Sequence, residues 1–314
     1  MHRLEFREVR KRSLKAERSM QRSSCFGASL VTNLHHFIAL VCATLVRTML
    51  PMGLGVSFDF GHVYGFASAI YGAPKQFAVQ ERSGMHETSP LKLSHFDHFP
   101  ESLLDVPATS LWQYLDSPSL FHISGRREEP IFVSVLLHGN EHSGWRAAQA
   151  IIRRHRDIPL PRSLLLFVGN IEAAKMNVRT LAHQQDYNRV WLSASEDRAP
   201  EAVLMREVFD IVKRRRPFAA IDVHNNTGNN PHYACVTNLA PRFLHLARLF
   251  GRTVVYFTKP EGVQTGALSK ISPSVTVECG RSEDIAGDEH VVEFISSALG
   301  LSQWPSHPVP ETDV

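Results

Sequence analysis

The chain has 314 residues and a mass of 35.3 kDa, which is enough for one large domain or two modest ones. Hydrophobic residues make up 43% of it and charged residues 21%, so a packed core is feasible and a wholly disordered chain is excluded. No apolar run reaches the roughly 20 residues that a membrane-spanning helix needs. The four cysteines are too few for a disulfide framework, and none forms the CxxC pair typical of cysteine zinc sites.

The net charge of +3 is concentrated at the N-terminus, where the first 22 residues hold eight basic and three acidic side chains. We expect this basic segment to be a solvated extension, with a nucleic-acid or membrane-surface arm as the alternative. The apolar stretch 37–46 resembles the hydrophobic part of a signal peptide, but the basic region before it is too long. We therefore expect a cytoplasmic protein, with secretion as the alternative.

Residues 1–84 show no clear periodicity, and we expect them to be a poorly ordered extension outside the main fold. A regular pattern follows over residues 85–300, which we expect to form one domain. Residues 301–314 contain Pro305, Pro308 and Pro310 and are expected to be a disordered tail.

Apolar runs and amphipathic segments alternate along residues 130–299. The runs predict strands at 130–137, 163–168, 218–223, 253–257 and 274–277. Helices are predicted at 143–155, with Ser143 as a cap, at 200–214, with Pro200 in the first turn, at 242–251, with Gly251 as the C-cap, and at 289–299. This alternation predicts a three-layer α/β/α sandwich with a mixed, largely parallel sheet.

Polar residues stand where the apolar strands end, and in open α/β sheets function lies at the carboxyl ends of strands. The first buried strand is followed by His138-Gly-Asn-Glu141, the third by Asp222-Val-His224, and the last by Glu278. His138, Glu141 and His224 would supply three zinc ligands and leave a fourth position for water, as in catalytic zinc sites. Glu278 is then the candidate for the carboxylate that takes the proton of that water. Asp222 shares a face with His224 and is interpreted as a supporting residue rather than a ligand.

Four motifs, in this order, resemble the succinylglutamate desuccinylase/aspartoacylase family of the zinc carboxypeptidase superfamily. They are His138-Gly-Asn-Glu141, Asp186-Tyr-Asn-Arg189, Ile221-Asp-Val-His224 and Val277-Glu278-Cys-Gly, and they span about half of the chain. The resemblance implies a zinc-carboxypeptidase-like fold, with one Zn²⁺ per chain held by His138, Glu141 and His224. It also implies that Glu278 is the general base.

The same resemblance implies that Asn188 and Arg189 hold a substrate carboxylate and that Arg179 stabilises the oxyanion. A guanidinium suits both tasks because it donates two parallel hydrogen bonds to a carboxylate and a positive charge to an oxyanion. The expected reaction is hydrolysis of an amide bond next to a carboxylate-bearing group, in an N-acyl amino acid or a short peptide. We expect a small-molecule or short-peptide substrate and no nucleic-acid partner, whereas the oligomeric state is not predictable from the sequence.

Two departures from the family pattern bear on this interpretation. Only Lys270, and no arginine, occurs in the stretch before Glu278 where aspartoacylase carries a further substrate-binding arginine. About 35 residues follow Glu278, too few for the C-terminal β-rich domain of the family. One alternative is therefore a truncated, weakened member that binds zinc and a small ligand without turnover.

A second alternative is the inverted zincin motif, H-x-x-E-H, which His138 to His142 also match. In that motif His138 and His142 would bind zinc and Glu141 would be the base. It requires a helix through these residues, whereas Gly139 directly after a strand indicates a turn.

Overall fold

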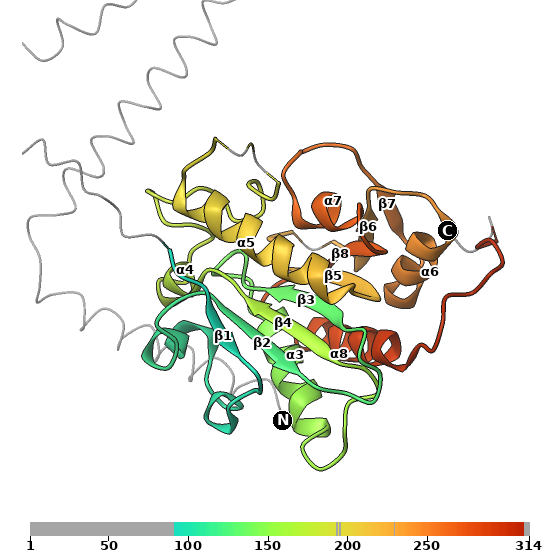
Figure 1. Ribbon diagram of the computed structural model, residues 1–314, viewed down its shortest axis with the longest axis horizontal. Helices are drawn as coiled ribbons and strands as arrows, with labels where there is room; N and C mark the ends of the chain where they lie inside the picture. Colours follow the sequence, from blue (N-terminus) through green and yellow to red (C-terminus); the bar gives the residue numbers. More distant parts are fainter. Residues whose placement is uncertain (1–90, 193, 195, 229, 311–314) are drawn as a thin grey trace, which may run out of the picture. The chain divides into compact units, whose positions relative to one another are not determined.

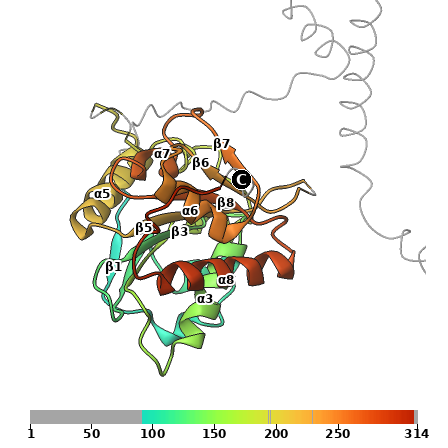
Figure 2. The same cartoon turned by 90° about the vertical axis from the view of Figure 1, so that its right-hand side faces the viewer.

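The computed structural model describes residues 91–192, 194, 196–228 and 230–310, and the fold is shown in Figures 1 and 2. The predictions made for residues 1–84 lie outside the described residues. Among the helices that are described, none is long and apolar enough to cross a membrane.

An eight-stranded sheet in the order β1-β2-β4-β3-β5-β8-β6-β7 forms the centre of the fold. Its middle strands β4, β3, β5 and β8 run parallel, while β2 is antiparallel to β4 and β6 is antiparallel to β8. The mixed, largely parallel sheet predicted from the sequence is therefore confirmed. The strands are β1 (Ser94–Phe96), β2 (Ser119–Ile123), β3 (Ile131–Val135), β4 (Leu164–Val168), β5 (Ala219–His224), β6 (Tyr233–Val236), β7 (Val254–Tyr256) and β8 (Ser274–Glu278).

Helices cover both faces of the sheet and give the predicted three layers (Figure 2). On one face lie α3 (Ser143–Arg154), α6 (Pro241–Phe250) and α8 (Ile285–Gly300), and on the other lie α5 (Pro200–Arg215) and the short α7 (Gln264–Leu268). Residues of β3 alternate between the two cores, because Ile131 and Val133 pack with the α3 side and Phe132 packs with the α5 side. This double burial explains why β3 is apolar except for Ser134, whose hydroxyl donates to Asp222 at 2.7 Å.

The remaining elements are short. Two 3₁₀ helices, η3 (Glu101–Leu103) and η4 (Ala108–Gln113), precede β2, and α4 (Ile171–Lys175) follows β4 and packs against η4. The sequence patterns did not identify β1, β2, β6, α4 or α7. Each of these elements has three to five residues and lies outside the apolar runs and amphipathic segments on which the predictions were based.

Two helix starts differ from the predictions. The N-cap of α3 is His142, so Ser143 is the first helical residue, and its hydroxyl accepts a hydrogen bond from Asn225 at 2.9 Å rather than capping the helix. Helix α8 begins at Ile285, four residues before the predicted start, because the Asp284 side chain accepts a hydrogen bond from the Ala286 N–H and caps it.

Residues 301–310 form no helix or strand, yet they contact the domain. The Trp304 ring stacks on Phe218 with a centroid distance of 4.7 Å, and His245 lies 2.8 Å from the carbonyl oxygen of His307. The described part of the predicted tail is thus anchored to the fold by aromatic stacking and a hydrogen bond.

Candidate active site

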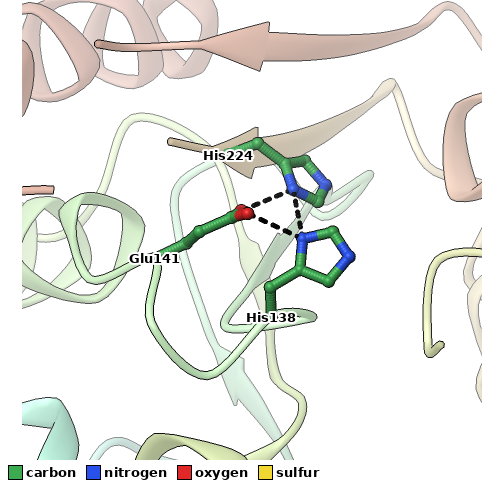
Figure 3. Close-up of side chains that lie close together, drawn as sticks. All are labelled: His138, Glu141 and His224. Carbon is green, nitrogen blue, oxygen red and sulfur yellow. Dashed lines mark hydrogen bonds and ion pairs between the residues drawn. The ribbon is translucent and has the colours of Figure 1, made fainter. Parts of the chain in front are cut away.

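Three buried side chains converge at the carboxyl ends of β3 and β5 (Figure 3). Nδ1 of His138 lies 2.8 Å from Glu141 Oε1, and Nδ1 of His224 lies 2.7 Å from Glu141 Oε2. The two Nδ1 atoms are 3.1 Å apart, and one potential ligand atom from each residue lies within 4.8 Å of the others. Within the described residues no other group of His, Cys, Asp and Glu side chains has this geometry.

A tight turn presents His138 and Glu141 to the same point. The Glu141 N–H donates to the carbonyl oxygen of His138 at 3.2 Å, and α3 begins only at Ser143. Gly139 is required in this turn because a Cβ there would lie 2.2 Å from backbone atoms of Ala173 and Ala174. His224 reaches the cluster from the last position of β5, which is parallel to β3.

His142 does not take part in the cluster. Its Nε2 lies 3.0 Å from the carbonyl oxygen of Gly139, and no helix runs through residues 138–142. The inverted zincin alternative is therefore wrong for this chain, because that motif depends on a helix to bring its two histidines together.

Each histidine of the cluster is oriented by a carboxylate on its other nitrogen. Asp186 Oδ1 lies 3.0 Å from Nε2 of His138, and Asp222 Oδ2 lies 2.7 Å from Nε2 of His224. Such carboxylates fix the ring and raise its basicity in metal sites. The structure thus places Asp222 on the ring nitrogen of His224 that does not contact Glu141, whereas the contact of Asp186 was not predicted, although Asp186 belongs to a motif identified in the sequence.

The cluster carries opposed charges at close range. Burial alone would raise the pKa of Glu141, but the neighbouring His224 and His138 lower it to about 2. Burial likewise opposes a charge on His224, but Asp222 and Glu141 hold the pKa of its imidazole well above the usual value. A pair of imidazoles and a carboxylate in this arrangement suits a divalent cation, which would replace the protons that the cluster otherwise retains.

Glu278 lies at the end of β8, directly opposite His224 in the parallel register of β5 and β8. Burial raises the pKa of its carboxyl group to about 7, with the charges of Glu141 and Asp222 adding to the effect against the opposing His224 and His138. Its Oε2 is buried and has no hydrogen-bond partner. A carboxylate with these properties, beside the His–Glu–His cluster, has the chemistry of a general base.

The three remaining predicted residues line the same cavity, which has a volume of about 980 Å³. The Arg179 guanidinium is about half exposed and lies 2.9 Å from Asp186 Oδ2 and 3.6 Å from Glu141 Oε1. Arg189 is exposed and donates to the carbonyl oxygen of Asn188 at 2.7 Å. Both guanidinium groups therefore line the cavity that contains the His–Glu–His cluster, where they are available to a ligand bound in it.

Asn188 has a different environment from the one expected for a substrate ligand. Its Nδ2 donates to Asp222 Oδ2 at 3.0 Å, and its Oδ1 accepts from the backbone N–H of Gln264 at 2.8 Å. The structure thus shows it holding Asp222 and the start of α7, while a contact to substrate stays a prediction. Sequence reasoning also missed the cavity residues Tyr233, Lys259 and Arg281, which belong to no recognised motif.

Comparison with known proteins bears on the fold. No protein-family model matches the chain, and no curated protein matches it in sequence. Solved structures do match. The succinylglutamate desuccinylase from Chromobacterium violaceum is 18% identical with a TM-score of 0.51, and 60% of this chain covers 68% of that one.

Two further desuccinylases of the same kind are similar. The enzyme from Vibrio cholerae is 13% identical with a TM-score of 0.50, and 66% of this chain covers 74% of it. The enzyme from Vibrio parahaemolyticus is 15% identical with a TM-score of 0.46, and 59% of this chain covers 60% of it. The chain therefore has the fold of solved succinylglutamate desuccinylases over about two thirds of their length and carries a buried His–Glu–His cluster consistent with a metal site.

Proposed function

We propose that the protein is a zinc-dependent hydrolase that cleaves an amide bond next to a carboxylate-bearing group. The observation that carries this proposal is the convergence of His138, Glu141 and His224 beside Glu278, in one cavity at the carboxyl ends of parallel strands. Burying four ionisable side chains at one edge of the sheet costs free energy that apolar packing does not offset, whereas a bound cation would offset it.

The three cluster residues would hold one Zn²⁺ per chain. Bound there, zinc would lower the pKa of a water molecule towards neutrality and polarise the scissile carbonyl group. Asp186 and Asp222 keep the two imidazoles oriented with Nδ1 towards the centre. They also keep the rings basic, which favours the retention of a dication.

Glu278 would accept a proton from the attacking water and deliver it to the leaving amine. Its Oε2 makes no hydrogen bond within the protein, and a general base contributes typically 10²- to 10⁴-fold to such a reaction. Arg179 would stabilise the oxyanion. Arg189, which donates to the backbone carbonyl oxygen of Asn188, would bind the carboxylate of the substrate through parallel hydrogen bonds. The substrate is then a small molecule or short peptide with a carboxylate near the cleaved bond.

The first test is the metal content of the purified full-length protein, measured beside two variants. We expect about one zinc per chain in the parent and in His142→Ala, since His142 lies outside the cluster, and a loss of most of the metal in His224→Ala. If the parent binds no zinc even after reconstitution, the proposed metal centre is wrong.

The second test separates hydrolysis from binding without turnover. Glu278→Gln should retain zinc and lose at least about 100-fold in kcat on any N-acyl amino acid or peptide that the parent cleaves. Near-parental turnover in this variant would refute the assigned base. A parent that retains zinc and binds such compounds without cleaving them would instead support the binding-only alternative.

A further inference from the structure

Three segments lie side by side where the central parallel strands begin, at the edge of the sheet opposite the His–Glu–His cluster. The turn 124–130, between β2 and β3, is the middle one. The Arg126 N–H donates to the carbonyl oxygen of Leu160 at 2.9 Å, and the carbonyl oxygen of Pro130 accepts from the Phe218 N–H at 2.8 Å. These contacts join the turn to the end of α3 and the loop after it, and to the end of α5 and the residues after it. We call the face formed by residues 124–130, 153–160 and 213–218 the amino-end surface.

The amino-end surface is strongly basic. Its exposed basic side chains number two in the turn 124–130, three in 153–160 and four in 213–218, against two, one and no acidic side chains. Arg153 and Arg156 pair with Asp105 and Glu101. The other seven basic side chains form no ion pair with any described residue, so most of this positive charge is not compensated within the described part of the chain.

The stabilisation of helix ends explains only part of this charge. Five of the basic residues lie in the last turns of α3 and α5, where a positive charge interacts favourably with the helix dipole. Arg126, Arg127 and Arg216 lie outside the helices and gain nothing from this effect. Crowding of like charges destabilises a folded chain. An anionic partner on the amino-end surface would offset that cost.

An aliphatic side chain is exposed among these charges. Ile158 is 55% exposed, and behind it lies a cavity of about 390 Å³ that it lines together with Ile123, Ile152 and Leu160. A basic face with an exposed aliphatic side chain suits an anionic membrane, because the charges meet the headgroups and the apolar group enters the boundary of the acyl chains. Single-stranded nucleic acid is bound instead by stacking on aromatic rings. The three segments, all of which the structure describes, expose no Phe, Tyr or Trp side chain.

We propose that the amino-end surface binds the anionic surface of a lipid membrane, with Ile158 inserted among the headgroups. The cavity with the His–Glu–His cluster lies at the carboxyl ends of the strands whose amino ends form this surface, so it would face the water. The bound protein would therefore keep its cavity open to water-soluble compounds. This binding does not depend on the proposed hydrolysis, because the two surfaces share no residue.

The test measures binding of the full chain to lipid vesicles by co-sedimentation. We expect binding to vesicles of phosphatidylcholine mixed with phosphatidylserine, and no binding to vesicles of phosphatidylcholine alone. Binding should weaken as the salt concentration rises. The triple variant Arg126→Gln, Arg127→Gln and Arg214→Gln should bind at least about tenfold more weakly, because each basic side chain near an anionic membrane contributes about fivefold to the affinity.

A charge-matched control carries Lys92→Gln, Arg198→Gln and Arg252→Gln, at exposed positions outside the amino-end surface. It should bind as the parent does, and any contribution of the basic residues near the N-terminus is the same in both variants. Thermal melting and zinc content of both variants should match those of the parent, whether or not the parent holds zinc. Equal weakening in the two triple variants would overturn the proposal, as would a parent that does not bind the anionic vesicles.

A second pair of variants tests the apolar contact at unchanged charge. Ile158→Ser should weaken binding to the anionic vesicles about three- to tenfold, because it removes the inserted side chain. Val203→Ser, at an exposed position on α5, should have no effect. An unchanged affinity in Ile158→Ser, together with tighter binding of the parent to a single-stranded RNA than to the vesicles, would assign the surface to nucleic acid and refute the membrane.

Discussion

Asp222 and His224 stand two residues apart on β5, and Oδ2 of Asp222 lies 2.7 Å from Nε2 of His224. Residues two apart on a strand share a face, so the strand itself aligns the carboxylate with the ring. Asp222 is completely buried, and Ser134 and Asn188 donate to it at 2.7 and 3.0 Å. Ser134 and Asn188 thus fix one carboxylate, and that carboxylate fixes the imidazole of His224 in the proposed metal site.

Asp222→Asn is expected to weaken zinc binding about 10- to 100-fold. A neutral amide orients the His224 ring less firmly than a carboxylate does and raises its basicity less. The measurement is a competition titration with a chelator of known zinc affinity. Asp210→Asn, at an exposed position on α5, is the matched control and should bind zinc as the parent does. An unchanged affinity in Asp222→Asn would contradict the orienting role.

Zinc binding is expected to weaken as the pH falls. Asp222 and Glu141 raise the pKa of His224 above its usual value despite burial, so the metal-free cluster retains a proton that zinc must displace. Below this raised pKa, the logarithm of the zinc affinity should rise by up to about one per pH unit from that proton alone, and above it the slope should flatten. Calorimetric titrations between pH 6 and 8, in buffers of different ionisation enthalpy, count the protons released. No release at pH 6 would contradict this protonation state.

Gly139→Ala is expected to destabilise the protein and the metal cluster together. The new Cβ would lie 2.2 Å from the backbone of Ala173 and Ala174, so the turn between His138 and Glu141 must move. We expect a loss of about 1–3 kcal/mol in the free energy of unfolding, or more, measured by urea denaturation. Gly300→Ala is the control, because its Cβ would meet no atom within 4 Å, and it should change the stability by less than about 0.5 kcal/mol.

Trp304→Ala is expected to lower stability without affecting the metal site. The indole stacks on Phe218 at 4.7 Å with an interplanar angle of 7°, and the Arg162 guanidinium lies 3.8 Å from the centroid of the Phe218 ring. Loss of the stack should cost about 1–2 kcal/mol, counting the ring pair and the buried area. Gln303→Ala, at the exposed neighbouring position, should have no measurable effect. Equal stability of the two variants would show that residues 301–310 do not contribute to the fold.

The sequence by itself predicted the parallel core and the side chains that form the His–Glu–His cluster. Runs such as 130–137 and 163–168 are apolar on both faces because helices cover both sides of the sheet, and this pattern is unmistakable without coordinates. His138, Glu141, His224 and Glu278 were identifiable because parallel strands bring their carboxyl ends to one edge, so residues at strand ends meet wherever the strands are neighbours.

Only the tertiary structure decided which side chains around the cluster are engaged and which are free. Asn188 is held by Asp222 and the Gln264 N–H, Asn225 is held by Ser143 and by Gly280 after β8, and Asn226 has no partner for its carboxamide. Three asparagines have the same chemistry in the sequence. Whether each carboxamide finds partners depends on strands and turns that are distant along the chain, so it follows from the packing of those elements and not from local pattern.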